Sequence, residues 1–108
     1  MRLTVTEDHK GEGEFPTFSV GSTITNIAPC KKFKNWVEGT VEQYTTYFPT
    51  DYIKNDKLIC NYNPTELIAR QGSAVNLLQV VYEWALVENE TGAIGWLPFE
   101  KLRSLDEN

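Results

Sequence analysis

The sequence predicts an all-β protein made of two small β domains. Three observations carry this prediction: short runs rich in Val, Ile, Thr, Tyr and Trp alternate with turn residues, helix signals are nearly absent, and the same landmarks occur twice in the same order. Short strands separated by regularly spaced turns are typical of barrels and sandwiches. A length of 108 residues suits one domain or two very small ones.

Each expected strand is rich in β-branched or aromatic residues, and most are bounded by Gly, Pro or Asn. In order, the expected strands lie in residues 19–29, 35–41, 45–49, 73–82, 84–89 and 93–98. The one helix-like stretch, residues 63–72, has Asn63 before Pro64 as a possible cap. It is short and runs directly into β-rich sequence, so no long helix is expected there.

An internal duplication relates the two halves. Gly21 and Gly72 precede matching strands 51 residues apart, and Trp36 and Trp84 open matching strands 48 residues apart. The prolines of "YFPTDYI" and "WLPFEKL" are 49 residues apart. Landmarks in one order at nearly one spacing indicate a repeat.

We therefore place a boundary at the polar stretch "KNDK", residues 54–57, and expect domains at residues 1–55 and 56–108. Domains of about 53 residues are near the lower limit for an independent core, so we expect the two to pack closely. The first half has a net charge of −1 and the second of −4, which sum to the −5 of the whole chain.

Composition excludes several functional classes. Hydrophobic residues make up 41% of the chain and charged residues 23%, which is ordinary for a globular protein. The net charge of −5 argues against binding to nucleic acid or to an anionic membrane surface. The N-terminal residues lack the apolar segment of a signal peptide, and no run approaches a membrane span of about 18 residues. We expect a cytoplasmic protein.

Catalytic and metal-binding motifs are absent. His9 is the single histidine and has no paired nucleophile around it. Cys30 and Cys60 lack metal-ligand spacing with His9, and we expect both to be free, partly buried thiols. The sequence predicts no enzyme, no metal and no cofactor.

A family resemblance rests on several short motifs. In the second half these are "LICNYNPTEL", "RQG" and "EWALVENETGAIGWLP", and in the first half "TFSVGSTI", "NWVEG" and "YFPTDYI". Each half resembles a Src-homology-3 domain, a five-stranded small barrel that binds proline-rich peptides. The pair resembles the tandem Src-homology-3-like proteins of bacteria. The resemblance implies two such barrels in tandem, closely packed.

The resemblance also implies an aromatic groove in each half. Flat aromatic rings pack on a preordered polyproline II helix at low entropic cost. In the first half the groove residues are Trp36, Pro49 and Tyr52, with His9 where the family has a tyrosine. In the second half they are Tyr62, Trp84 and Pro98, with Lys101 where the family has a tyrosine. The first half therefore has the better groove, and Trp96 is expected to pack in the core.

Charged residues flank the expected groove of the first half. The long loop that the family places beside its ligand contains four acidic residues, Glu7, Asp8, Glu12 and Glu14. In the family, acidic residues of this loop bind a basic residue next to the prolines of the ligand. Lys31, Lys32 and Lys34 have the opposite sign and would contact an acidic partner or neutralise that loop.

The leading functional hypothesis is a non-catalytic adaptor that binds an extended peptide or protein segment, with proline-rich segments carrying a basic residue as first candidates. The main alternative is a structural or oligomerisation module whose aromatic surfaces are covered by the other barrel or a second subunit. Cell-wall peptide recognition is a third reading, and nucleic-acid binding is the weakest.

Overall fold

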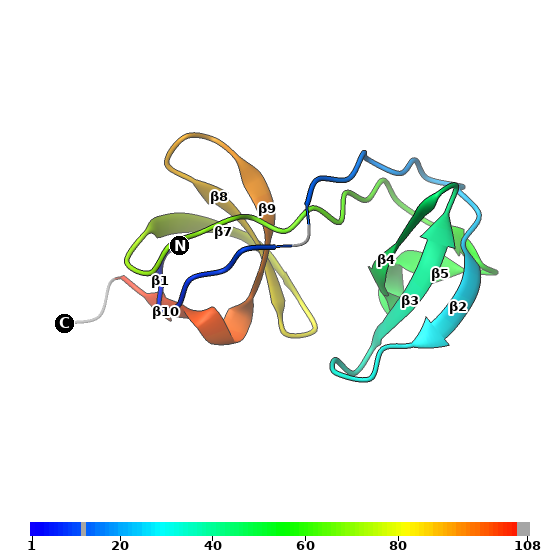
Figure 1. Ribbon diagram of the computed structural model, residues 1–108, viewed down its shortest axis with the longest axis horizontal. Coiled ribbons are helices and arrows are strands. Elements are labelled where there is room, and N and C mark those ends of the chain that lie inside the picture. Colours follow the sequence, from blue (N-terminus) through cyan, green and yellow to red (C-terminus); the bar gives the residue numbers. More distant parts are fainter. Residues whose placement is uncertain (12, 106–108) are drawn as a thin grey trace. The chain divides into compact units, whose positions relative to one another are not determined.

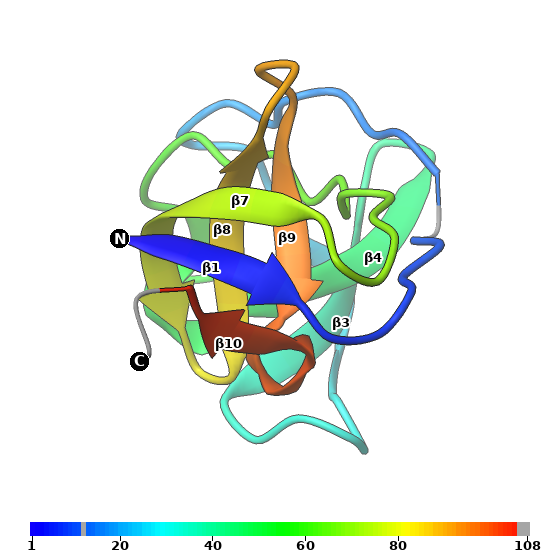
Figure 2. The ribbon, with the colours of Figure 1, turned by 90° about the vertical axis from the view of Figure 1, so that its left-hand side faces the viewer.

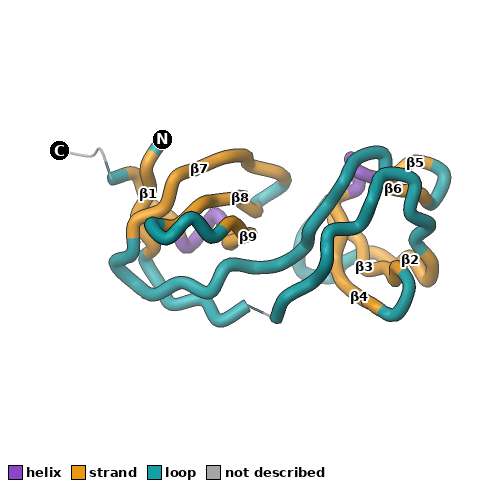
Figure 3. The backbone as a smooth tube through the Cα atoms, turned by 90° about the horizontal axis from the view of Figure 1, so that it is seen from above, coloured by secondary structure: helices purple, strands orange, loops and turns teal. Residues whose placement is uncertain are grey.

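The computed structural model describes residues 1–11 and 13–105, and within them the protein is all-β, as predicted. The only helical segments in this part of the chain are two short 3-10 turns, η1 and η2, drawn purple in Figure 3. Residues 63–72 form extended backbone and a turn, not a helix. No helix in the described part of the chain is long and apolar enough to cross a membrane.

The chain divides into two compact units whose boundaries differ from the expected ones. Unit 1 consists of Met1–Glu14 and Thr65–Asn108, and unit 2 of Phe15–Pro64. Unit 2 is thus inserted into the sequence of unit 1, in place of the expected succession of residues 1–55 and 56–108. Both ends of unit 1 are needed for one sheet, because the first strand pairs with strands near the C-terminus.

The stretch "KNDK" is a tight hairpin and not a linker. Lys54 pairs with Lys57 across a two-residue turn, in which Asn55 and Asp56 have φ values of 53° and 61°. Two consecutive positive φ values are the mark of a type I′ turn, which Asn and Asp tolerate well. The polar composition that suggested a domain boundary is therefore explained by local turn geometry.

Unit 1 contains one five-stranded sheet with the order β10-β1-β7-β8-β9. Its elements are β1 Arg2–Val5, β7 Ala74–Val81, β8 Trp84–Asn89, β9 Ile94–Pro98, η2 Phe99–Lys101 and β10 Leu102–Ser104. Figure 2 shows β1 lying between β7 and β10. The N-terminal strand is therefore an interior strand of this sheet, with a neighbour on each side.

Unit 2 contains a three-stranded sheet, β2-β3-β4, and a two-stranded sheet, β5-β6, both labelled in Figure 3. Its elements are β2 Thr25–Pro29, β3 Trp36–Val41, β4 Tyr44–Pro49, η1 Thr50–Tyr52, β5 Ile53–Lys54 and β6 Lys57–Leu58. An isolated bridge between Thr23 and Lys57 connects the two sheets.

The sheets are open, so the closed five-stranded barrels that we expected are not what the structure contains. In unit 1 the free edge of β9 pairs with residues 65–67 and not with β10: Leu67 N donates to the Trp96 carbonyl at 3.0 Å. Gly95 permits this approach, because a Cβ there would come within 2.7 Å of the Leu67 nitrogen. In unit 2, β5 and β6 have two residues each and are too short to close a barrel.

The two units repeat one arrangement, as Figure 1 shows for the hairpins β3–β4 and β8–β9. Trp36 pairs with Pro49 in the first hairpin, and Trp84 pairs with Pro98 in the second. A 3-10 turn and a short strand follow each proline. The landmarks that suggested a duplication thus occupy equivalent positions.

The two cores differ in chemistry. The core of unit 1 is aliphatic and is formed by Leu3, Val5, Leu67, Ala69, Val75, Ala85, Val87 and Leu97. Unit 2 has an aromatic core, in which Phe48 lies 6.1 Å from Phe18 and 5.5 Å from Tyr62 between ring centroids. Large buried rings allow so small a unit to remove much apolar surface from water.

Candidate functional site

The structure exchanges two of the predicted groove residues between the units. His9 was expected beside Trp36, but it belongs to unit 1 and its ring lies 6.1 Å from that of Trp84. Tyr62 was expected beside Trp84, but it belongs to unit 2 and its ring lies 5.5 Å from that of Tyr52. The insertion explains the exchange, because each half of the sequence contributes chain to both units.

The aromatic cluster of unit 2 is largely buried. Trp36 is 6% exposed, Tyr62 is 4% exposed, and Pro49 is fully buried, while Tyr52 is half-buried. The hydroxyl of Tyr62 donates to the Tyr47 carbonyl at 2.7 Å, which satisfies its polar atom in the core. Two of the three residues expected to line the groove of the first half, Trp36 and Pro49, are therefore core residues, and only Tyr52 is partly accessible.

Unit 1 contains the most accessible of the three tryptophans. Trp84 is half-buried, whereas Trp36 and Trp96 are buried. Pro98, which pairs with Trp84 across β8 and β9, is buried. Phe99 follows directly and is 41% exposed. We call Trp84, His9, Glu66 and Lys101 the Trp84 site.

Hydrogen bonds fix the end of the sheet that carries the Trp84 site. Phe99 N donates to the Glu83 carbonyl at 2.8 Å and so ties η2 to the turn before β8. Tyr82 and Glu83 form that turn with φ values of 41° and 77°. Thr6 N donates to the Lys101 carbonyl at 2.7 Å, which ties η2 to the N-terminal strand as well.

A polar triad surrounds His9 at the Trp84 site. His9 Nε2 lies 2.6 Å from Glu66 Oε1, and Lys101 Nζ lies 3.2 Å from His9 Nδ1. A lysine ammonium can only donate, so Nδ1 accepts the hydrogen bond from Lys101 and Nε2 donates to Glu66. The side chains of His9 and Glu66 are 12% and 15% exposed, so this hydrogen bond is partly shielded from water.

Lys101 is engaged rather than free. Besides its contact with His9, its ammonium donates to the Asp8 carbonyl at 3.2 Å. The residue that replaces the family's tyrosine thus completes a polar network at the base of the site. Glu66 was missed by sequence reasoning, because it lies 57 positions from His9 and no local pattern connects the two.

One residue of the acidic loop, Asp8, has a structural role. The Asp8 carboxylate accepts from Gln71 N at 2.7 Å and so supports the turn before β7. Glu7 and Glu14 are exposed and give unit 1 negative surface charge. Glu12 lies outside the described residues. Lys31, Lys32 and Lys34 are exposed on a loop of unit 2.

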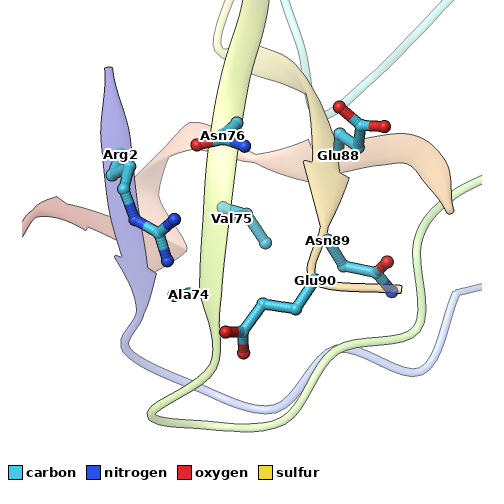
Figure 4. Close-up of a pocket in the computed structure, with 7 residues that line it drawn as sticks. All are labelled: Arg2, Ala74, Val75, Asn76, Glu88, Asn89 and Glu90. Atoms are coloured by element: carbon cyan, nitrogen blue, oxygen red, sulfur yellow. The ribbon is translucent and has the colours of Figure 1, made fainter. Parts of the chain in front are cut away.

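A shallow pocket of about 270 Å³ lies elsewhere on unit 1 (Figure 4). It is lined by Arg2, Ala74, Val75, Asn76, Glu88, Asn89 and Glu90. Figure 4 shows the guanidinium of Arg2 and the carboxylate of Glu90, two groups of opposite charge, on the same side of the pocket. No aromatic residue lines it, so it is not the predicted groove.

The two cysteines are free and half-buried, as predicted. Desolvation by burial raises the pKa of the Cys60 thiol. A group of three or more His, Cys, Asp and Glu side chains that could hold a metal ion does not occur among residues 1–11 and 13–105.

We compared the chain with protein-family models, with curated proteins and with solved structures. None of the three comparisons gave a match. The functional reading therefore depends on the residues of the chain and on their geometry.

Proposed function

We propose that the protein is a non-catalytic binding module that holds an extended peptide or protein segment at the Trp84 site of unit 1. The observation that carries the proposal is the half-buried ring of Trp84 beside a hydrogen-bonded polar triad. The face of an indole ring supplies apolar contact area, which suits the packing of an extended segment. In this reading both units are open variants of the Src-homology-3-like arrangement that the motifs suggested.

The negative charge of unit 1 favours a bound segment with a basic residue at one end. Unit 1 contains five basic and eleven acidic residues, a net charge of −6, and unit 2 contains five and four, a net charge of +1. Glu83 and Glu100 are exposed next to Trp84 and Phe99 in the sequence. Complementary charge steers association and selects partners more than it raises affinity, so we expect binding near micromolar, about −8 kcal/mol.

The state of His9 supports a non-catalytic role. Both ring nitrogens are engaged, one by Glu66 and the other by Lys101. A general base needs a nitrogen that can reach the proton of a substrate or nucleophile. The triad is better suited to orienting His9 as one wall of a binding surface.

The test is an NMR titration of the ¹⁵N-labelled protein with proline-rich peptides that have an arginine or lysine at one end. We expect shifts at the Trp84 indole, at His9 and at Glu66, and we expect Trp84→Ala to weaken binding by about 2 kcal/mol, about thirtyfold, as for an interface hot spot. Tyr47→Ala, which removes an exposed ring from unit 2, is the matched control and should leave affinity within about twofold. Absence of shifts at the Trp84 site would contradict the proposal.

A structural role is favoured for the aromatic cluster of unit 2. Trp36, Pro49 and Tyr62 are buried, as expected for residues that hold the unit together. In single-tryptophan variants, acrylamide should quench Trp84 and leave Trp36 shielded. A shielded Trp84 would instead extend the structural or oligomerisation reading to unit 1.

A further inference from the structure

The loop between β2 and β3, residues 30–35, concentrates positive charge in an acidic protein. Lys31, Lys32 and Lys34 are exposed, and Phe33 between them is half-buried. We call these four residues the lysine loop. It belongs to unit 2 and shares no residue with the Trp84 site.

The backbone of the lysine loop is held at both ends. Cys30 N donates to the Trp36 carbonyl at 3.0 Å, and Thr50 N donates to the Asn35 carbonyl at 2.9 Å. Inside the loop, Phe33 N donates to Cys30 Sγ at 3.4 Å. Asn35 closes the loop with a φ of 67°, a conformation that Asn adopts more readily than most residues. A preformed loop loses little conformational entropy when it binds.

The charges of the lysine loop are not neutralised within the part of the chain that the structure describes. Among the described residues, none of the three lysines takes part in an ion pair. The ammonium of Lys32 lies 5.3 Å from the centre of the Phe33 ring, a cation–π interaction that leaves its charge in place. Three like charges within four positions repel each other, and an external anion would relieve that repulsion.

We propose that the lysine loop binds an acidic, extended segment of a partner protein. Each of the three lysines would face one carboxylate of the segment. Phe33 would pack against the methylene groups of the segment's acidic side chains. Three lysines on a unit with a net charge of +1, in a chain with a net charge of −5, match a short acidic segment. A short acidic segment needs to contact only the lysine loop, whereas nucleic acid and an anionic membrane are extended polyanions, which the net charge of −5 disfavours.

The experiment measures the fluorescence anisotropy of a fluorescein-labelled peptide of alternating Glu and Ser residues, titrated with the full chain at about 0.05 M salt. Lys31→Glu with Lys34→Glu should weaken binding about tenfold. The matched control is Lys54→Glu with Lys57→Glu, two exposed lysines of the same unit, which changes net charge equally and should have less than about a twofold effect. Circular dichroism and melting curves establish that both variants remain folded.

Additional peptides and variants distinguish binding through carboxylates at the lysine loop from nonspecific binding. A peptide with Gln in place of Glu should show no binding, and Phe33→Ala should weaken binding to the acidic peptide about threefold. Equal losses in both double variants, no binding of the acidic peptide, or tighter binding to a short DNA duplex or to phosphatidylserine vesicles would each overturn the proposal. Because the lysine loop shares no residue with the Trp84 site, these outcomes are independent of those for the proposed function.

Discussion

At the scale of single residues, Trp36 and Trp84 show how equivalent positions acquire different roles. Each opens a strand and pairs with a proline in the neighbouring strand. Trp36 belongs to an aromatic core and is 6% exposed, whereas Trp84 is half-buried and meets His9 edge-on. The position of a residue in the repeat therefore determines its pairing partner in the sheet but not how exposed its side chain is.

This difference predicts opposite consequences for the two alanine substitutions. Trp36→Ala should lower the free energy of unfolding by about 3–5 kcal/mol, because it leaves a cavity in a small aromatic core. Trp84→Ala should lower it by about 1 kcal/mol, since the ring is partly exposed already. Urea denaturation followed by circular dichroism measures both. Equal losses of stability in the two variants would contradict this division of roles.

At the scale of elements, turn chemistry decides where the hairpins form. Asn89 organises the hairpin between β8 and β9: its side-chain oxygen accepts from Thr91 N at 3.0 Å, from the Thr91 hydroxyl at 2.8 Å and from Ala93 N at 2.9 Å. Asn is suited to such turns because its short side chain reaches backbone donors two to four residues on. The Asn89 side chain thus adds three hydrogen bonds to the two backbone bonds of this turn, Asn89 N to the Ala93 carbonyl and Gly92 N to the Asn89 carbonyl.

Substitution of Asn89 tests how much its side-chain hydrogen bonds stabilise the hairpin. Asn89→Ala removes the acceptor and should destabilise the protein by about 1–2 kcal/mol. Asn89→Asp keeps an oxygen at the same place and should cost less than about 0.5 kcal/mol. Thermal melts of the two variants compare them directly. If the Asp variant is as unstable as the Ala variant, the hydrogen bonds at Oδ1 are not what holds the hairpin.

At the scale of the whole molecule, the insertion of unit 2 into the sequence of unit 1 determines how the charges are divided between the two units. Divided at residue 55, the sequence has net charges of −1 and −4. Divided by the units of the structure, it has net charges of −6 and +1. The negative charge therefore concentrates on the unit that carries the Trp84 site, and the lysine loop stands on the nearly neutral one. The two proposed surfaces would select partners of opposite charge.

The insertion also makes a prediction about fragments. Replacement of residues 15–64 by a flexible linker of about four to six residues should leave unit 1 folded, because its five-stranded sheet and its aliphatic core lie wholly within the retained chain. The fragments 1–55 and 56–108 should not fold, because the cut separates β1 from β7 and β10. Dispersion of amide signals in NMR spectra distinguishes these cases. Folded half-chains would restore the tandem arrangement expected from the sequence.

Local patterns alone determined the all-β class, the places of the main hairpins and the equivalence of the two repeats. Strand propensity, turn residues and the spacing of Trp and Pro act over a few residues, so they can be read directly. The same local reading mistook "KNDK" for a linker, because a type I′ turn and a polar connector have similar composition.

Only the tertiary structure decided which residues meet. His9 and Lys101 are 92 positions apart, and His9 and Glu66 are 57 apart, yet all three lie at one site. Such contacts depend on which strands the N-terminal segment pairs with. Because the chain is a repeat, each of its two similar hairpins could accept that segment. Pairing of β1 with β7 and β10 placed His9 beside Trp84 and left Tyr62 for the core of unit 2, and no periodicity in the sequence distinguishes that pairing from its alternative.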